Sequence, residues 1–159
     1  MNAFKILGMS MVAVGGGAIC YFLCKKEDAA LCRATAWGTL VSFIGSQVEC
    51  FALPIGQVLS RADATLLRDC GYIGKKAPTD LKYRIKNSVI EDRTLRAAAE
   101  GFCSGFGRGY IDEQTARCKY YAGIFEERKR KLGAELPTKK KLYATLCISA
   151  SLAVIILFL

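Results

Sequence analysis

Two long stretches of the chain, residues 6–23 and 142–159, contain no charged side chain. As helices rising about 1.5 Å per residue, each would reach roughly 27 Å, close to the hydrocarbon thickness of a bilayer. The second stretch follows Lys139–Lys141, and its Ser and Thr side chains can bond back to their own helix. The pattern predicts an N-terminal transmembrane anchor over residues 1–24 and a C-terminal transmembrane helix over residues 142–159.

The first stretch also resembles a cleaved secretory signal, because a lone Lys5 precedes an apolar run. Cleavage needs small residues before the cut, and in the lipobox-like string Gly17–Cys20 the position that needs a small residue holds Ile19. We therefore expect a retained anchor, with a cleaved signal as the alternative.

Between these stretches, apolar residues recur every three or four positions, which is the period of helices packed on one side. The longest run is expected from Asp28, placed to cap it, to Phe51, and Gly38 and Gly45 share a face that predicts close approach of another helix. Its apolar stripe comprises Leu31, Thr35, Trp37, Leu40, Val41, Phe43, Ile44, Val48 and Phe51. Further helices are expected at 54–61, 63–70, 80–88, with Thr79 as cap, 90–106, and from Asp112 to about Leu136. Pro137 interrupts this last helix but leaves it almost continuous with the terminal one, with a kink. No period-two alternation occurs, so the predicted fold class is all-α: an antiparallel helical bundle of about five to six helices, over residues 25–141, between the two transmembrane helices.

The net charge is +9, and all but one of the 23 basic residues lie between the two uncharged stretches, together with all 14 acidic residues. The densest basic clusters adjoin the stretches, so the positive-inside rule predicts a cytoplasmic central domain and a cell-membrane location. A membrane-tethered domain that binds nucleic acid is the alternative, since phosphates also attract such charge. The run Arg128–Lys131 lacks interleaved aromatic residues and follows two glutamates, which favours a solvated helix face.

The chain has eight cysteines and no histidine. Cys20, Cys24 and Cys147 lie in or beside the uncharged stretches, and the others form no C-x-x-C pair, so we expect reduced, mostly buried thiols and no metal site. None of the common catalytic motifs occurs, and adjacent carboxylates such as Glu91 and Asp92 point in different directions on a helix. The prediction is a protein that is not an enzyme and needs no cofactor.

The string GFCSGFGRGY, residues 101–110, raises the question of a phosphate-binding loop. Its pattern is G-x-G-x-G without a following lysine, and the residues before it have a helical rather than a strand pattern, unlike the dinucleotide fingerprint. We therefore expect a turn between two antiparallel helices. The candidate residues for this turn, or for a partner interface at it, are Gly105, Gly107, Arg108, Gly109, Glu113 and Gln114.

Two segments carry a family resemblance: LPIGQVLSRADATLLRDCGY at 53–72 and FCSGFGRGYIDEQTARCKYYAGIFEERKRKLGAELPTKKKLYATL at 102–146. With the terminal stretches, they resemble the stage III sporulation protein AB family of endospore-forming bacteria, whose domain is similar to the cytoplasmic domains of type II secretion F proteins. Those proteins have two such domains, whereas this chain has one.

The resemblance implies a membrane scaffold in the channel between mother cell and forespore. The implied partners are a cytoplasmic secretion-type ATPase and other membrane proteins of the channel, and the implied location is the mother-cell membrane facing the forespore.

Overall fold

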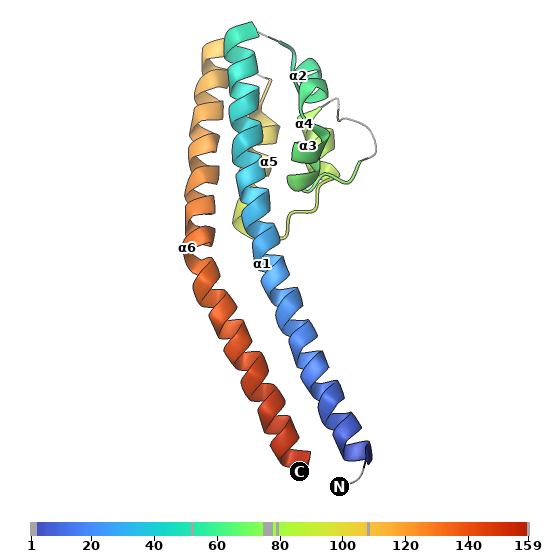
Figure 1. The fold of residues 1–159 in the computed structure, drawn as a ribbon. Helices are drawn as coiled ribbons and strands as arrows, with labels where there is room; N and C mark the ends of the chain where they lie inside the picture. The colour runs from blue at the N-terminus through green and yellow to red at the C-terminus, as the bar shows by residue number, and fades with distance from the viewer. Residues whose placement is uncertain (1–2, 52, 75–77, 79, 108, 159) are drawn as a thin grey trace. The chain divides into compact units, whose positions relative to one another are not determined.

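The computed structural model describes the backbone of residues 3–51, 53–74, 78, 80–107 and 109–158, with their side chains except those of 3–7, 9, 157 and 158. Within these ranges the regular structure is helical, apart from an isolated antiparallel bridge between Tyr72 and Ser88 (Figure 1). The helices are α1 (Ala3–Phe51), α2 (Ile55–Arg61), α3 (Ala64–Asp69), α4 (Leu81–Lys86), α5 (Arg93–Gly105) and α6 (Ile111–Phe158). The predicted all-α class is confirmed.

The chain divides into two compact units, and α1 and α6 contribute to both. Unit 1 comprises residues 1–29 and 132–159, and unit 2 comprises residues 30–131. In unit 1 the two helical segments pack closely at Gly16, where an added Cβ would collide with the hydroxyl of Ser151. In the part of the chain that the structure describes, no helix combines the length and mean hydropathy needed to cross a bilayer. The two transmembrane helices therefore stay a prediction.

The predicted helix start at Asp28 is wrong. Asp28 does not cap a new helix, because α1 continues through it, and its carboxylate instead pairs with the Lys140 ammonium at 2.7 Å. The predicted near-continuity across Pro137 is confirmed, since this proline lies inside α6, which runs on without a break. A proline in a helix removes one backbone donor and can be accommodated when the residues on both sides continue the helix. The sequence between residues 18 and 37 has neither Gly nor Pro, so nothing there stops α1.

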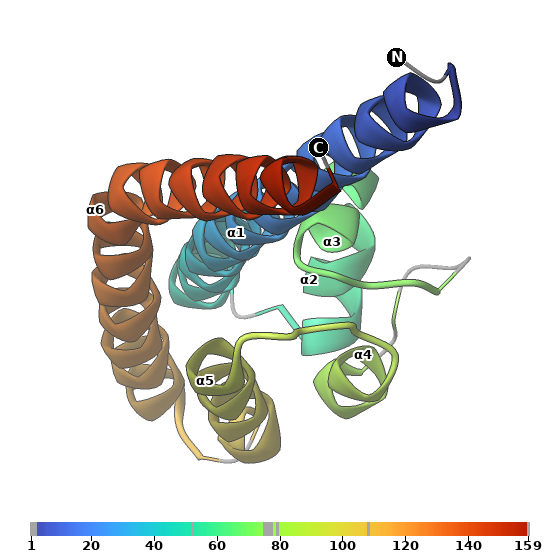
Figure 2. The ribbon, with the colours of Figure 1, turned by 90° about the horizontal axis from the view of Figure 1, so that it is seen from below.

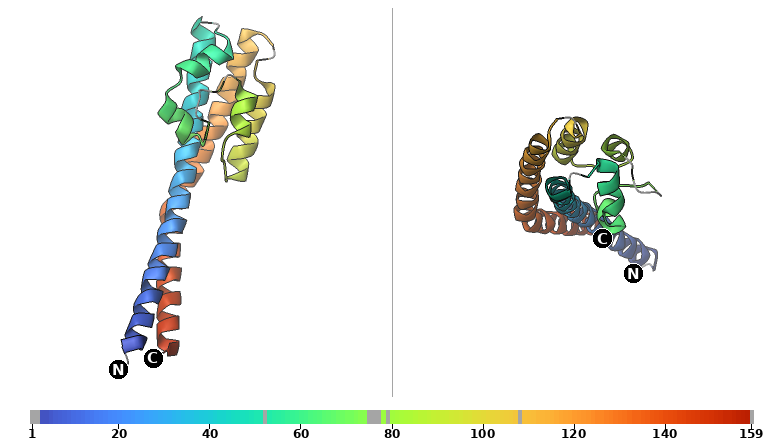
Figure 3. Two further views of the ribbon diagram at one scale, coloured as in Figure 1. Left: turned by 90° about the vertical axis from the view of Figure 1, so that its right-hand side faces the viewer. Right: turned by 90° about the horizontal axis from the view of Figure 1, so that it is seen from above.

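The core of unit 2 is built around Trp37 of α1, which is completely buried. Its ring stacks on Phe125 of α6 with centroids 5.7 Å apart, and its Nε1 donates to the Cys70 carbonyl, just after α3, at 3.0 Å. The views from below, from the side and from above show the unit 2 segment of α1 surrounded by helices α2 to α6 (Figures 2 and 3). Trp37 therefore joins three elements that are far apart in the sequence.

The predicted core stripe of α1 is confirmed for Trp37, Leu40, Val41, Ile44 and Val48, which are all buried. It is wrong for Thr35, which is exposed, and for Phe51, which is 62% exposed at the end of the helix. The spacing of apolar residues identifies which face of the helix is buried. How many residues of that face are covered depends on the neighbouring helices.

The short helices begin at capping residues. Asp63 accepts a hydrogen bond from the Thr65 N–H at 2.9 Å, as predicted for α3. Asp92 accepts from the Leu95 N–H at 2.7 Å, so α5 begins at Arg93 rather than at the predicted Ile90. The predicted cap Thr79 lies outside the described residues. Helices of six or seven residues are marginal alone, so packing must hold α2 to α4 in place.

Candidate functional site

The glycine string forms the turn between α5 and α6. The helix α5 ends at Gly105, Gly107 has φ +83° and Gly109 has φ +103°, and α6 begins at Ile111. Positive φ is strained for residues with a Cβ, so both glycines have a conformational reason to be there. The turn follows a helix, as expected, whereas a dinucleotide loop follows a strand.

Five of the six candidate residues come together at this turn, and the sixth, Arg108, lies outside the described residues. The Gln114 amide donates to the Gly109 carbonyl at 3.1 Å. A Cβ at Gly109 would collide with the Glu113 carboxylate, and one at Gly105 would collide with the Arg117 guanidinium. A carboxylate and a guanidinium therefore both lie against the turn.

A second feature of unit 2 is the contact between α1 and α6, where glycines allow close approach. A Cβ added at Gly38 would lie 3.7 Å from the Phe125 Cβ, and one at Gly45 would lie 3.0 Å from the Cys118 Cβ. The predicted role of these two glycines is confirmed.

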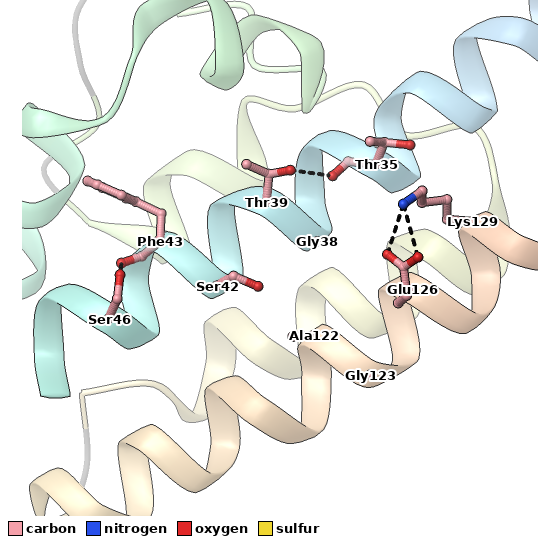
Figure 4. Close-up of a pocket in the computed structure, with 10 residues that line it drawn as sticks. All are labelled: Thr35, Gly38, Thr39, Ser42, Phe43, Ser46, Ala122, Gly123, Glu126 and Lys129. Atoms are coloured by element: carbon pink, nitrogen blue, oxygen red, sulfur yellow. Dashed lines mark hydrogen bonds and ion pairs between the residues drawn. The ribbon is translucent and has the colours of Figure 1, made fainter.

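Two hollows follow this contact on the surface of unit 2. The larger, of about 710 Å³, is bordered by hydroxyl-bearing side chains of α1 on one side and by α6 on the other (Figure 4). The smaller, of about 190 Å³, shares Ser42, Ser46 and Ala122 with it. We call the two together the α1–α6 groove, lined by Thr35, Gly38, Thr39, Ser42, Phe43, Gly45, Ser46, Glu49, Thr115, Cys118, Lys119, Ala122, Gly123, Glu126 and Lys129.

The buried side-chain polar atoms of the groove have hydrogen-bond partners among the described residues, with one exception. The Thr35 and Thr39 hydroxyls donate to the carbonyls of Leu31 and Thr35 at 3.0 and 3.1 Å. The charged side chains form two acid–base pairs: Lys119 with Glu49 at 3.5 Å and Lys129 with Glu126 at 2.9 Å. The exception is Thr115, which is 9% exposed. Its Oγ1 is buried and has no hydrogen-bond partner among the described residues.

A third feature is the buried guanidinium of Arg84 in α4. The residue is completely buried, and its three guanidinium nitrogens have no hydrogen-bond partner among the described groups. The Cζ atom lies 4.2 Å from the centroid of the Trp37 ring, on which it makes a cation–π contact. The sequence reading missed Arg84, although its three-residue spacing from the buried Leu81 places both on one helix face.

The buried thiols do not supply a nucleophile. Burial raises the pKa of Cys70 to about 11 and that of Cys103 to about 12, although the nearby Arg84 charge lowers both. Burial likewise raises the pKa of Cys118 to about 11. All eight cysteines are free, but Cys32 and Cys50 are exposed, so the prediction of mostly buried thiols holds only for Cys70, Cys103 and Cys118. Within the described residues, no group of three or more acidic, Cys or His side chains could hold a metal ion.

Charge pairing accounts for most of the basic run at residues 128–131. Arg128 bonds to Asp92 and Lys129 to Glu126. Lys131 pairs with Glu127 at 2.7 Å, as its spacing predicts. Glu126 lies four residues before Arg130 but pairs with Lys129. Three of the four basic side chains thus form ion pairs within the chain.

Comparison with known proteins gives no relative: no family model, no curated protein and no solved structure matches the chain.

Proposed function

We propose that this chain is a membrane-anchored scaffold without catalytic activity, whose unit 2 docks a partner protein. The observation that carries the proposal is the apolar surface of unit 1. Large apolar side chains are exposed along both of its helical segments: Met11, Val14, Ile19, Tyr21, Phe22 and Leu23 on α1, and Leu142, Leu146, Ile148, Leu152, Val154 and Ile156 on α6. Several, including Phe22 and Ile156, are 72% exposed. Apolar surface of this extent marks a membrane or protein contact.

The ends of this apolar surface also support a membrane contact. On α1 it is followed by Lys25 and Lys26, and on α6 it is preceded by Lys139–Lys141. Glu27 accepts hydrogen bonds from the Lys139 ammonium and the Tyr143 hydroxyl, both at 3.1 Å. Basic residues beside an apolar segment favour the headgroup region of anionic lipids. The uncharged stretches also include residues 6, 7, 9 and 157–159, whose side chains lie outside the described part of the chain.

The partner follows from the resemblance to the stage III sporulation protein AB family. We propose a cytoplasmic secretion-type ATPase and other membrane proteins of the sporulation channel, at the mother-cell membrane facing the forespore. The surface at the glycine turn is suited to such a contact, because Tyr110 is 82% exposed and Ile111 is 47% exposed beside it. Exposed aromatic side chains are frequent anchors of protein interfaces.

Membrane attachment is tested by washing membranes of cells that express the full chain with alkaline carbonate. The chain should stay in the pellet, because its apolar surface is held by lipid rather than by charge. Ile148→Lys should reduce the retained fraction severalfold, whereas Tyr83→Lys, a matched change on exposed unit 2 surface, should not. Complete release of the unmodified chain into the supernatant would disprove the anchor.

The partner is tested by a photo-crosslinking amino acid at Tyr110 in sporulating cells, with Val89, also exposed, as the control position. The expected product is a covalent adduct with the secretion-type ATPase from position 110 alone. Recovery of the same adduct from both positions, or of no channel component from either, would contradict docking at the turn.

A further inference from the structure

We infer that unit 1 binds an anionic phospholipid, with an acyl chain in a hollow between its two helical segments and the phosphate at two lysines beyond one end of that hollow. The hollow, of about 440 Å³, is called the unit 1 groove. It is bordered by residues of both helices, among them Val12, Gly15 and Ile19 of α1 and Leu146, Ala150 and Val154 of α6. The inference rests on the proposed membrane anchor and adds to it a binding site and a class of lipid.

The unit 1 groove is apolar and open to the surroundings. Ile19 is 60% exposed and Leu146 is 55% exposed at its border. The two helical segments run side by side here (Figures 1 and 3), and they meet at Gly16 and Ser151, which also line the groove. A flexible hydrocarbon chain that lies in such a groove gains van der Waals contacts with side chains of both helices.

Both faces of the unit 1 groove lead to a lysine. Lys26 lies seven residues after Ile19 on α1, and Lys139 lies seven residues before Leu146 on α6. Seven residues are nearly two helical turns, so each lysine shares the face of its helix that lines the groove, about 10 Å further along the axis. The Lys139 ammonium donates to Glu27, the neighbour of Lys26, so both lysines lie at the same end of the groove.

The charge at this end favours an anion. Residues 25–28 and 135–141 contain five lysines and three carboxylates, so positive charge is in excess. Lys139 pairs with Glu27 and Glu135, both at 3.1 Å, and an ammonium has three donors, so a third can reach a phosphate oxygen. Clusters of lysines beside an apolar segment attract anionic headgroups.

The distance between the apolar and basic ends matches the length of a lipid. The axial rise is about 21 Å from Val12 to Lys26 and about 22 Å from Val154 to Lys139. Half of a bilayer, headgroups included, is about 20–22 Å thick. One phospholipid therefore reaches both ends. A second copy anchored in the same membrane would bring its own lysines to this level, and like charges repel each other there.

Lipid binding is tested by native mass spectrometry of the purified full chain. The detergent contains equal amounts of phosphatidylglycerol, which is anionic, and phosphatidylcholine with the same acyl chains, which is not. We expect phosphatidylglycerol to be retained at least fivefold over phosphatidylcholine, because several lysines contribute to its binding. Equal retention of the two lipids, or retention of neither, overturns the site.

Gly15→Phe tests the position of the acyl chain, and Gly17→Phe is the matched control. Gly15 lines the groove, whereas Gly17 lies two residues further and faces nearly the opposite side of α1. A Cβ added at either position meets no described atom within 4 Å, so circular dichroism should show an unchanged fold. Gly15→Phe should abolish the preference for phosphatidylglycerol, and Gly17→Phe should preserve it. Equal retention by the two variants overturns the proposal.

Lys26→Gln tests the position of the phosphate. Its matched control is Lys25→Gln, which removes the same charge from a side of α1 that is turned by about 100°. Lys26→Gln should reduce the preference for phosphatidylglycerol about fivefold, whereas Lys25→Gln should leave it nearly unchanged. An equal reduction by both variants means that general charge attracts the lipid, and overturns the site.

The lipid site and the membrane anchor can fail separately. A chain that stays in the pellet after the carbonate wash but retains both lipids equally keeps the anchor and overturns the site. A chain that carbonate releases overturns the anchor, whichever lipid the purified chain retains. A dimer in detergent that retains no phosphatidylglycerol and that Gly15→Phe abolishes assigns the groove to a second copy, and overturns the lipid site.

Discussion

Arg84 is the residue at which unit 2 departs most from an ordinary helical core. A buried cation normally has a carboxylate or several hydrogen-bond acceptors beside it. Here the face of Trp37 is its principal described contact, at 4.2 Å, and a desolvated cation–π contact contributes only about 2 kcal/mol. The free energy lost by removing a guanidinium from water is several kcal/mol, so Arg84 costs more stability than it contributes.

Arg84→Met should therefore raise the free energy of unfolding by about 1 kcal/mol or more, because the methionine fills similar space without a charge. Thermal unfolding followed by circular dichroism measures the change. Arg84→Ala is the control and should lower the melting temperature, since it leaves a cavity beside Trp37. If Arg84→Met destabilises the fold as much as Arg84→Ala does, the guanidinium has a stabilising partner. The buried charge then does not lower the free energy of unfolding.

At the scale of single elements, α5 depends on one carboxylate. Asp92 caps the helix and also accepts a hydrogen bond from Arg128 of α6, so it joins two helices. Its side chain is only 12% exposed. Burial opposes its ionisation, but the bonds from Arg128 and from the Leu95 N–H outweigh burial and hold the pKa of the carboxyl below its ordinary value.

A lowered pKa in the folded state means that Asp92 stabilises the fold above its unfolded-state pKa of about 3.9. This stability is lost as the pH falls through the folded-state value. Asp92→Asn keeps a capping side chain but removes the charge, so it should lower the free energy of unfolding by about 1–2 kcal/mol at pH 7. Urea unfolding at pH 7 and pH 2.5 should show the difference shrinking at acid pH. A difference that is independent of pH would indicate that the charge is unimportant.

The α5–α6 turn requires a residue that tolerates positive φ at position 109. Gly109→Val should lower the free energy of unfolding by about 2 kcal/mol, because valine is strained at φ +103° and its Cβ would collide with Glu113. Chemical unfolding of the variant measures the loss. Gly133→Val is the control, since a Cβ there meets nothing within 4 Å in α6, and it should be neutral. Equal stability of both variants would count against a structural role for Gly109.

At the scale of the whole molecule, local signals predicted much of the fold. Helical periodicity predicted the elements, and Asp63 predicted a cap. Gly38 with Gly45 predicted the close approach of another helix, which the structure identifies as α6. Each of these depends on neighbouring residues in one helix, which the sequence displays directly.

The features that sequence reasoning missed depend on contacts between distant segments. Arginine is usually found on protein surfaces, so its type does not predict burial. Arg84 is buried because α4 packs against Trp37. Thr35 belongs to an apolar period, yet it borders the groove because α6 leaves that side of α1 open. Asp28 lies inside α1 and pairs with Lys140, which lies over a hundred residues away in the sequence.

Trp37 is the sole tryptophan of the chain, and it is enclosed between Phe125 and Arg84. Its indole fluorescence is therefore an intrinsic optical reporter placed at the centre of unit 2. Excitation of indole alone isolates the signal of this unit, because unit 1 contains no such chromophore. Emission from Trp37 can follow the folding of unit 2 in the intact chain, in detergent or lipid, without an added label.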